Sequence, residues 1–287
     1  MEESIDCIIK IRSLYPSMSV VEKKIADYIL LHPGEVVFMT VAQLASQIGT
    51  AESSVVRFCH SIGFQGFSSL KINLAQNQEK NQKYMLDEIS MDDDCSSTLG
   101  ITSKVFSSVI RSLNETLELV SEEILSQTVD ALCKANKIIF YGIGTSAVIA
   151  SDTYYRFMRI GLPASAATDP HIMLLSASML DENSVAFGIS HTGRTIETIR
   201  AMETAHKQGA RTICLTSHQN SPITQISDIS IVTSASENKM LREAITSRIA
   251  HITIMDSLYA CISLKRYDTV KHKLDVMHEL LESVRMN

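Results

Sequence analysis

Short apolar runs alternate with helical patterns over much of the second half of the chain. The runs that we predict as strands cover 137–141, 163–166, 184–189, 211–215 and 229–232, and segments with helical spacing lie between them. Strands at this spacing are typical of βαβ units, in which crossover helices join parallel strands. The sequence therefore predicts an α/β domain, a doubly wound five-stranded parallel sheet with helices on both faces.

The beginning of the chain has a different pattern, which is helical. Ser19 and Glu22 fit a capping box, in which each side chain satisfies a backbone N–H that the first turn leaves free. Thr40 and Gln43 fit a second capping box. Each pair precedes apolar residues at helical spacing, so both predict helix starts in an all-α domain.

Composition shifts divide the chain into three zones. We expect the all-α domain over 1–77, a polar linker with an acidic run over 78–100, and the α/β domain with flanking helices over 101–287. The third zone opens with an amphipathic helical stretch that continues through Ile124, and a further long helix is expected over 241–264.

Residues 41–60 have the spacing of a helix-turn-helix. Ala45 is small enough for two helices to cross closely, Gly49 permits the sharp turn, and Val55 packs the second helix against the first. In this motif the second helix lies in the major groove of DNA, with its first residues near the base edges. A plain helical hairpin remains the alternative, because short helices that contain Ala and Gly are common.

The charge of this region favours DNA only locally. Residues 53–78 contain no acidic residue, but 1–77 as a whole hold six Lys and Arg against seven Asp and Glu. One copy should therefore bind DNA weakly and with a strong salt dependence, so useful affinity requires a dimer. Arg57 is the best candidate for a guanine or a phosphate. The candidate DNA-contacting residues are Thr50, Ser53, Ser54, Arg57, His60 and Lys71.

Two hydroxyl-rich loops each follow a predicted strand and precede a helix. The first loop covers 142–147 and the second loop covers 190–195. In parallel sheets ligands bind beyond the carboxyl ends of the strands, where helix N-termini offer N–H groups and a positive dipole end. Glycines let the backbone approach an anion, and hydroxyls donate to its oxygens. Either loop alone would be read as a helix cap, but the pair predicts a site for a phosphate monoester.

The first loop also fits G-x-G-x-x-A, the dinucleotide fingerprint. That site needs an acidic residue at the end of the next strand to bind the ribose, and 163–168 contain none. We therefore expect no nicotinamide or flavin and no other cofactor. The six cysteines form no CxxC pair and the nine histidines form no HExxH, so no metal site is expected either.

Taken together, the chain resembles the RpiR-type bacterial regulators, which join an N-terminal helix-turn-helix domain to a phosphosugar-binding SIS (sugar isomerase) domain. The first domain carries the resemblance in EKKIADYILLHPGEVVFMTVAQLA and SSVVRFCHSIGFQGFSSLK. The second carries it in IIFYGIGTSAVIASD, GISHTGRTIETI and REAITSRIAHITIMDSL. The resemblance covers nearly the whole chain and implies a flavodoxin-like sheet in the SIS domain.

The resemblance also implies roles for individual residues. Glu243 falls near the place where related isomerases keep a catalytic carboxylate. Ala51 stands where the family usually has a capping Ser, so Thr50 is expected to cap instead and to shift the helix start by one residue. Thr192 replaces the middle Ser of S-x-S-G-x-T and keeps the hydroxyl. The expected phosphosugar-binding residues are Gly144, Thr145, Ser146, Ser190, His191, Thr192, Thr195 and Glu243.

These features predict a transcriptional regulator of sugar or amino-sugar metabolism rather than an enzyme. Its partners would be double-stranded operator DNA with an inverted repeat, a phosphosugar effector and further copies of itself in a homodimer or homotetramer. The alternative is a phosphosugar isomerase or related enzyme with an accessory helical domain, in which Glu243 acts as the base. The opening residues lack the basic and apolar regions of a signal peptide, and no apolar run is long enough to span a membrane. We therefore expect a cytoplasmic protein.

Overall fold

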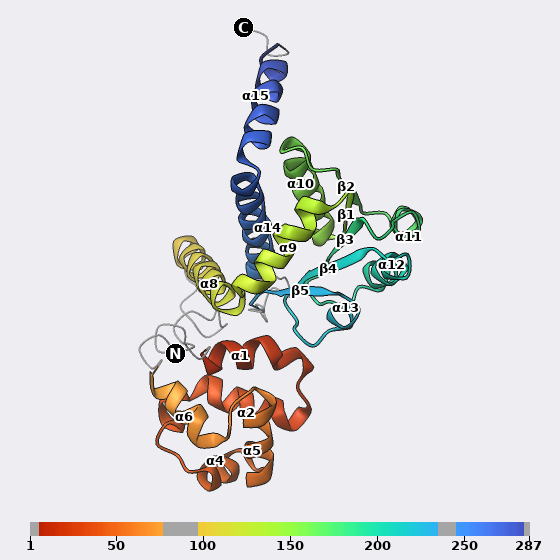
Figure 1. The fold of residues 1–287 in the computed structure, drawn as a ribbon. Helices are drawn as coiled ribbons and strands as arrows, with labels where there is room; N and C mark the ends of the chain where they lie inside the picture. The colour runs from red at the N-terminus through yellow and green to blue at the C-terminus, as the bar shows by residue number, and fades with distance from the viewer. Residues whose placement is uncertain (1–5, 77–96, 235–244, 284–287) are drawn as a thin grey trace. The chain divides into compact units, whose positions relative to one another are not determined.

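The computed structural model describes residues 6–76, 97–234 and 245–283, and its contacts form two compact units (Figure 1). The first unit comprises Met1–Leu119 with Ser234–Thr246. The second comprises Val120–Thr233 with Ser247–Asn287. Each is described by itself below.

The first unit is helical in its described residues. Its hydrophobic core includes Ile8 of the first helix, Ile25 of the second, and Val55 and Phe58 of the fifth, all at most 3% exposed. Both predicted capping boxes are confirmed, at the starts of the second and fourth helices. The elements are α1 (Cys7–Leu14), the 3₁₀ turn η1 (Tyr15–Ser17), α2 (Val20–Leu31), α3 (Pro33–Val36), α4 (Val41–Ile48), α5 (Glu52–Ser61), α6 (Phe67–Gln76) and α8 (Thr98–Leu119).

The second unit contains the five-stranded parallel sheet that the sequence predicts, in the order β2-β1-β3-β4-β5. Three strands have the predicted bounds, while β2 is shifted by one residue and β4 extends to Thr216. The strands are β1 (Lys137–Tyr141), β2 (Ala164–Ala167), β3 (Ser184–Ile189), β4 (Arg211–Thr216) and β5 (Ile229–Val232). The helices are α9 (Glu122–Lys134), α10 (Thr145–Arg159), α11 (Pro170–Ala177), α12 (Ile196–Lys207), α13 (Pro222–Gln225), α14 (Ile245–Lys265) and α15 (Tyr267–Ser283).

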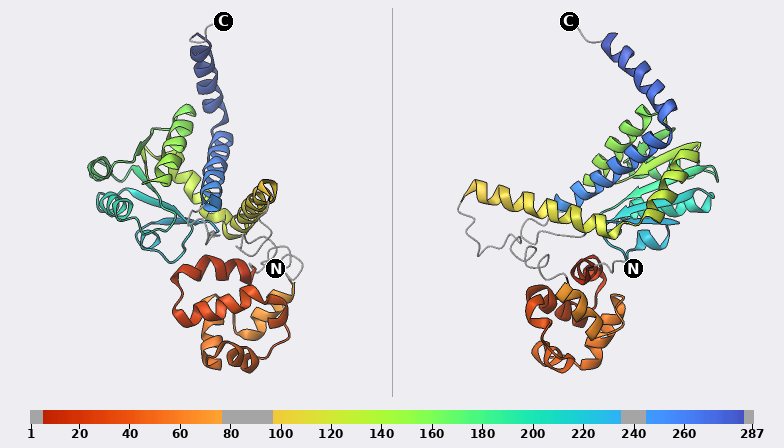
Figure 2. Two further views of the ribbon diagram at one scale, coloured as in Figure 1. Left: turned by 180° about the vertical axis from the view of Figure 1, so that it is seen from behind. Right: turned by 60° about the vertical axis from the view of Figure 1, so that its left-hand side comes forward.

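Helices cover both faces of this sheet (Figure 2). Side chains alternate between the faces along each strand, so Phe140 of β1 packs with α9, α10 and α14, whereas Tyr141 packs with α11 and α12. Burial on both faces explains why the strands read as nearly continuous apolar runs. The doubly wound α/β architecture is therefore confirmed.

Some predicted bounds differ from the structure. The helical stretch expected to continue through Ile124 is broken, because Ser121 caps a new helix and accepts the N–H of Ile124 at 3.2 Å. The end of the predicted linker already lies in the first turn of α8, while its residues 78–96 lie outside the described residues. Within the described part of the chain, no helix is long and apolar enough to cross a membrane.

Candidate anion site and nucleic-acid interface

The two hydroxyl-rich loops leave neighbouring strands of the sheet. β1 and β3 lie side by side, with Tyr141 opposite Gly188, but the chain proceeds from β1 to β2 on one side and from β3 to β4 on the other. The connections therefore diverge at this point, which is the place where ligands bind in open α/β sheets. The predicted loops thus follow the two strands at the switch point of the topology.

The first loop is shaped by glycines. A Cβ on Gly142 would lie 2.6 Å from the carbonyl oxygen of Ser146, so only glycine fits there. Gly144 has a φ of 62° and is the N-cap of α10. A glycine cap has no side chain to cover the helix end, so the positive end of the α10 dipole lies uncovered just after the carboxyl end of β1. Ser146 lies in the first turn and is 8% exposed, while Thr145 is exposed.

The second loop brings two hydroxyl groups together. Ser190 is buried at the end of β3, and its Oγ lies 3.1 Å from Thr195 Oγ1 at the N-cap of α12. Thr195 makes no capping hydrogen bond with its own helix. Gly193 has a φ of 62°, and a Cβ there would lie 2.2 Å from Ser221 Oγ. Thr192 is exposed and accepts the N–H of Arg194 at 3.3 Å. The loop therefore has a fixed backbone that positions paired hydroxyls.

Three histidines gather beside the second loop. The His191 ring lies 5.3 Å from the His218 ring and 6.3 Å from the His251 ring, measured between centroids. His218 Nδ1 lies 2.9 Å from the His191 carbonyl oxygen, so this nitrogen carries the proton and donates. Burial, followed by the electrostatic influence of the neighbouring rings of His191 and His218, lowers the pKa of His251 to about 3. No group in the described residues has the His, Cys, Asp and Glu ligands for a metal ion.

Sequence reasoning included only His191 of these three among the expected site residues. His251 is 1% exposed, in agreement with its apolar helical surroundings, but its proximity to the second loop had no local signal. His218 was missed, although its place just after a predicted strand could have drawn attention to it. Glu243 lies outside the described residues, and its expected role stays a prediction.

The helix-turn-helix has the predicted geometry. α4 ends at Gly49, whose φ of 72° is left-handed, and the chain turns into α5. The expectation that Thr50 caps the second helix is wrong, because α5 begins at Glu52 with Ala51 at the N-cap and without a side-chain capping bond. The Thr50 N–H instead donates to the Ala45 carbonyl at 2.9 Å, which places Thr50 inside the turn.

The DNA candidates lie in different environments. Ser53, Arg57 and His60 are exposed on one side of α5, and the Arg57 Nη2 donates to Ser54 Oγ at 3.3 Å. Lys71 is half-buried on α6 and donates to the Met39 carbonyl at 2.9 Å, so its ammonium group stabilises the turn before α4. The exposed face of α5 is therefore the main candidate surface.

The missing cap of α5 makes a stability prediction. Ala51→Ser restores a side-chain oxygen at the N-cap, and we expect the free energy of unfolding of the helical domain to rise by about 1 kcal/mol. Urea unfolding followed by circular dichroism measures this as a higher midpoint with an unchanged slope. A midpoint equal to that of the wild type would contradict the cap assignment.

Comparisons with known proteins agree with this arrangement. Residues 5–81 match the helix-turn-helix domain of the rpiR family, and residues 131–260 match the SIS domain. An HTH-type transcriptional regulator of Caldanaerobacter subterraneus is 36% identical over 282 residues, which cover 98% of this chain and 99% of that protein. The HTH-type transcriptional regulator HexR of Pseudomonas aeruginosa is 31% identical over 257 residues, which cover 90% of this chain and 89% of HexR.

A solved structure is similar over the same extent. The NanR protein of Vibrio vulnificus, in complex with ManNAc-6P, is 25% identical with a TM-score of 0.61, and the match covers 98% of this chain and 100% of NanR. The chain thus matches proteins named as HTH-type transcriptional regulators over nearly their whole length. The chain belongs to the RpiR family of helix-turn-helix transcriptional regulators.

Proposed function

We propose that this transcriptional regulator binds operator DNA through α5 and that a phosphosugar bound by the first and second loops controls its DNA affinity. The observation that supports it most is the position of both loops beside the switch point of the sheet, with the Ser190 and Thr195 hydroxyls 3.1 Å apart. The similarity to NanR, whose structure contains ManNAc-6P, supports a phosphosugar of amino-sugar or sugar metabolism as the ligand class.

Each loop has a defined task in this proposal. The phosphate group accepts hydrogen bonds from backbone N–H groups near Gly144 and Gly193 and from the hydroxyls of Ser146, Ser190 and Thr195. His191, beside these hydroxyls, contacts the sugar. The effector needs to favour one DNA-binding state by only about 1–3 kcal/mol, which is the usual size of allosteric coupling.

Arg57 is the central DNA contact of the proposal. Arg57→Ala is expected to weaken operator binding by about 1–3 kcal/mol per subunit, because a guanidinium contact to a guanine or phosphate is lost. Fluorescence anisotropy with labelled operator measures the loss. Lys24→Ala removes an exposed positive charge from α2 and is the matched control. Equal weakening by both substitutions would contradict a specific role of α5.

We further propose that the protein acts in the cytoplasm as a homodimer or homotetramer on an inverted-repeat operator. Support comes from an apolar stripe on α8, formed by Leu99, Phe106, Ile110 and Leu117, whose exposure ranges from 57% to 78%. These positions share one face of the helix, in the arrangement that helix pairing uses. A face of this kind gains free energy when a second copy covers it.

Phe106→Glu tests this stripe. We expect the molecular mass in sedimentation equilibrium to fall to that of a smaller assembly, and operator affinity to fall with it, because a charge is introduced into an apolar contact. Gln127→Glu adds the same charge at an exposed position of α9 and should keep the wild-type mass. An unchanged mass for Phe106→Glu would exclude the stripe as an assembly surface.

The proposed function as a whole is tested on the DNA that precedes the gene of this protein. Fluorescence anisotropy at moderate salt, with nonspecific competitor DNA, is measured without ligand and with a panel of sugar phosphates that includes ManNAc-6P. We expect saturable binding that changes with one sugar phosphate and not with the unphosphorylated sugar. DNA affinity that is unaffected by every phosphosugar, or turnover of one of them, would contradict the proposal.

A further inference from the structure

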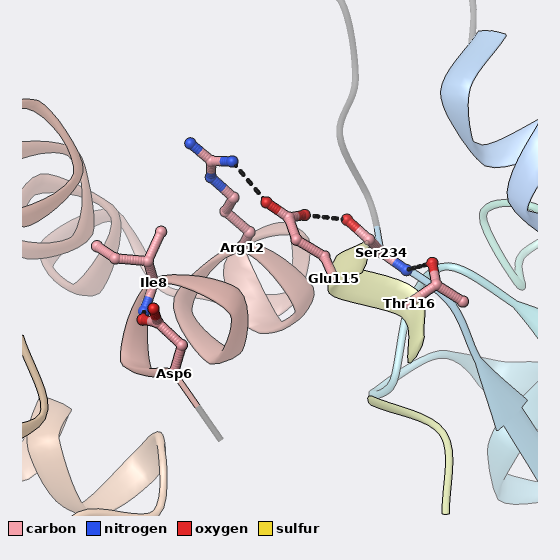
Figure 3. Close-up of polar contacts among 6 residues, drawn as sticks. All are labelled: Asp6, Ile8, Arg12, Glu115, Thr116 and Ser234. Carbon is pink, nitrogen blue, oxygen red and sulfur yellow. Dashed lines mark hydrogen bonds and ion pairs between the residues drawn. The ribbon is translucent and has the colours of Figure 1, made fainter. Parts of the chain in front are cut away.

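Glu115 of α8 is a fully buried carboxylate that joins two other segments of the first unit (Figure 3). Its Oε1 accepts a hydrogen bond from Arg12 Nη1 of α1 at 2.8 Å, and its Oε2 accepts one from the Ser234 hydroxyl. The neighbouring Thr116 Oγ1 accepts the N–H of Ser234 at 3.1 Å. A buried charge needs such partners because burial removes its water. Glu115 therefore depends on α1 through one oxygen and on Ser234 through the other.

Arg12 belongs to a helix in the core of the DNA-binding bundle. Ile8 and Ile11 of α1 are buried in the same hydrophobic cluster as Val55 and Phe58 of α5. Protein cores are close-packed, so a shift of α1 displaces the side chains that hold α5. The Arg12–Glu115 ion pair thus joins Glu115 to the helix that packs in the same core as α5.

Ser234 directly follows Thr233, which hydrogen-bonds to residues at the end of β4. The Thr233 N–H donates to the Thr216 carbonyl at 2.9 Å, and Thr233 Oγ1 lies 2.8 Å from Ser217 Oγ. The Ser217 N–H in turn donates to the carbonyl of His191 in the second loop at 3.0 Å. Hydrogen bonds therefore connect the second loop through Ser217 to Thr233, and the next peptide bond leads to Ser234.

We propose that Glu115 is the residue through which the effector site controls the DNA-binding helices. This inference rests on the proposed function and adds the residues through which the effector site acts on the DNA-binding helices. In one state Ser234 and Arg12 share the carboxylate. In the other state the effector withdraws the Ser234 hydroxyl, Glu115 loses one partner, and its hold on Arg12 changes. The two states then differ in the position of α1 and in DNA affinity.

Ser234→Ala tests the route without touching either binding site. It removes the hydroxyl that donates to Glu115 and keeps the peptide backbone. We expect the variant to bind operator DNA and ManNAc-6P, but the ratio of the DNA Kd with and without the sugar phosphate should fall from the wild-type value, about 5- to 150-fold for a coupled pair of sites, toward one. Ser178→Ala is the matched control, because its hydroxyl donates only to the Leu175 carbonyl of its own helix. A wild-type ratio in Ser234→Ala would overturn the proposal.

A second measurement separates this inference from the proposed function. Hydrogen–deuterium exchange of residues 7–14 is followed without any ligand in the wild type, Ser234→Ala, Glu115→Gln and Ser178→Ala. We expect α1 to exchange faster than in the wild type in Ser234→Ala and Glu115→Gln, because both substitutions weaken the contact between Glu115 and Arg12. The exchange of α1 in Ser178→Ala should equal that of the wild type. Unchanged exchange would overturn the role of Glu115. A wild type whose DNA affinity is indifferent to sugar phosphates would instead contradict the proposed function, and the exchange result would still decide the link.

Discussion

Replacing Gly193 by alanine is expected to abolish phosphosugar binding and to lower the free energy of unfolding of the SIS domain by about 2–6 kcal/mol, as backbone strain adds to overpacking. The φ of 62° is unfavourable for any side chain, and the new Cβ would lie 2.2 Å from Ser221 Oγ and 2.5 Å from Ser221 Cβ. Rotation of the hydroxyl relieves the first contact but not the second. The loop must therefore move, and the paired hydroxyls of Ser190 and Thr195 would lose their positions.

Gly49→Ala is the control that separates these two causes. Gly49 has a φ of 72°, but a Cβ there would meet no atom within 4 Å, so only the strain remains. Urea unfolding measures the free energy of unfolding, and isothermal titration with ManNAc-6P measures sugar phosphate binding. We expect Gly49→Ala to cost about 1–3 kcal/mol of stability and to leave sugar phosphate binding intact. Equal losses in the two variants, or normal ligand binding by Gly193→Ala, would contradict the tight contact of the second loop with Ser221.

Stability is expected to fall steeply as the solution is acidified. The pKa of His251 is lowered from its usual value of 6.5 to about 3, because the ring is buried and faces His191 and His218. Below pH 6.5 the imidazole of His251 is therefore protonated in the unfolded chain, whereas in the folded chain it stays neutral down to about pH 3. The free energy of unfolding is therefore unaffected by protonation of His251 above pH 6.5, and it falls by about 1.4 kcal/mol for each pH unit below that value. At pH 4 this amounts to a loss of about 3 kcal/mol.

His251→Asn identifies the residue responsible. Asparagine does not titrate, so the variant should show a flatter dependence of the urea midpoint on pH between pH 4 and pH 6.5 even if it is less stable at pH 7. His171→Asn is the control, because His171 is exposed on α11. A slope as steep in His251→Asn as in the wild type would assign the acid sensitivity to another group.

The strands, the two loops and the helix-turn-helix could be predicted because their signals are local. An apolar run such as 184–189, a glycine after it and a capping residue are read within a few positions. The parallel direction of the strands then follows from the crossover helices between them. The prediction of a helix cap at Thr50 was wrong, because the Thr50 N–H takes part in the turn and the helix begins only after Ala51.

Contacts between distant parts of the chain could not be predicted in this way. On an amphipathic helix Glu115 reads as a solvated acid, yet its carboxylate is fully buried and its partner Arg12 lies 103 positions earlier. Ser217 and His251 are 34 positions apart and meet only because β4 and α14 pack in one domain. Lys71 reads as a DNA contact, although its ammonium group bonds to Met39. Tertiary packing decides each of these cases, and no local pattern reports it.

Much of the candidate site stays a prediction. The structure shows the hydroxyls and glycines of both loops beside the switch point, but the identity of the effector, the operator and the role of Glu243 rest on the proposed function. The domain limits of 1–77, 78–100 and 101–287 likewise stay predictions. Contacts in the structure group α8 with the helices of the first unit.

The central claim, that one phosphosugar site and one DNA site are energetically coupled, is tested most directly by reciprocity. Isothermal titration gives the Kd of ManNAc-6P, or of another active sugar phosphate, for the free protein and for the protein saturated with operator DNA. Thermodynamic linkage requires these two constants to differ by the same factor by which the sugar phosphate changes the DNA Kd. We predict equal factors of about 5- to 150-fold. Identical sugar phosphate affinities of the free and the DNA-bound protein would contradict the account.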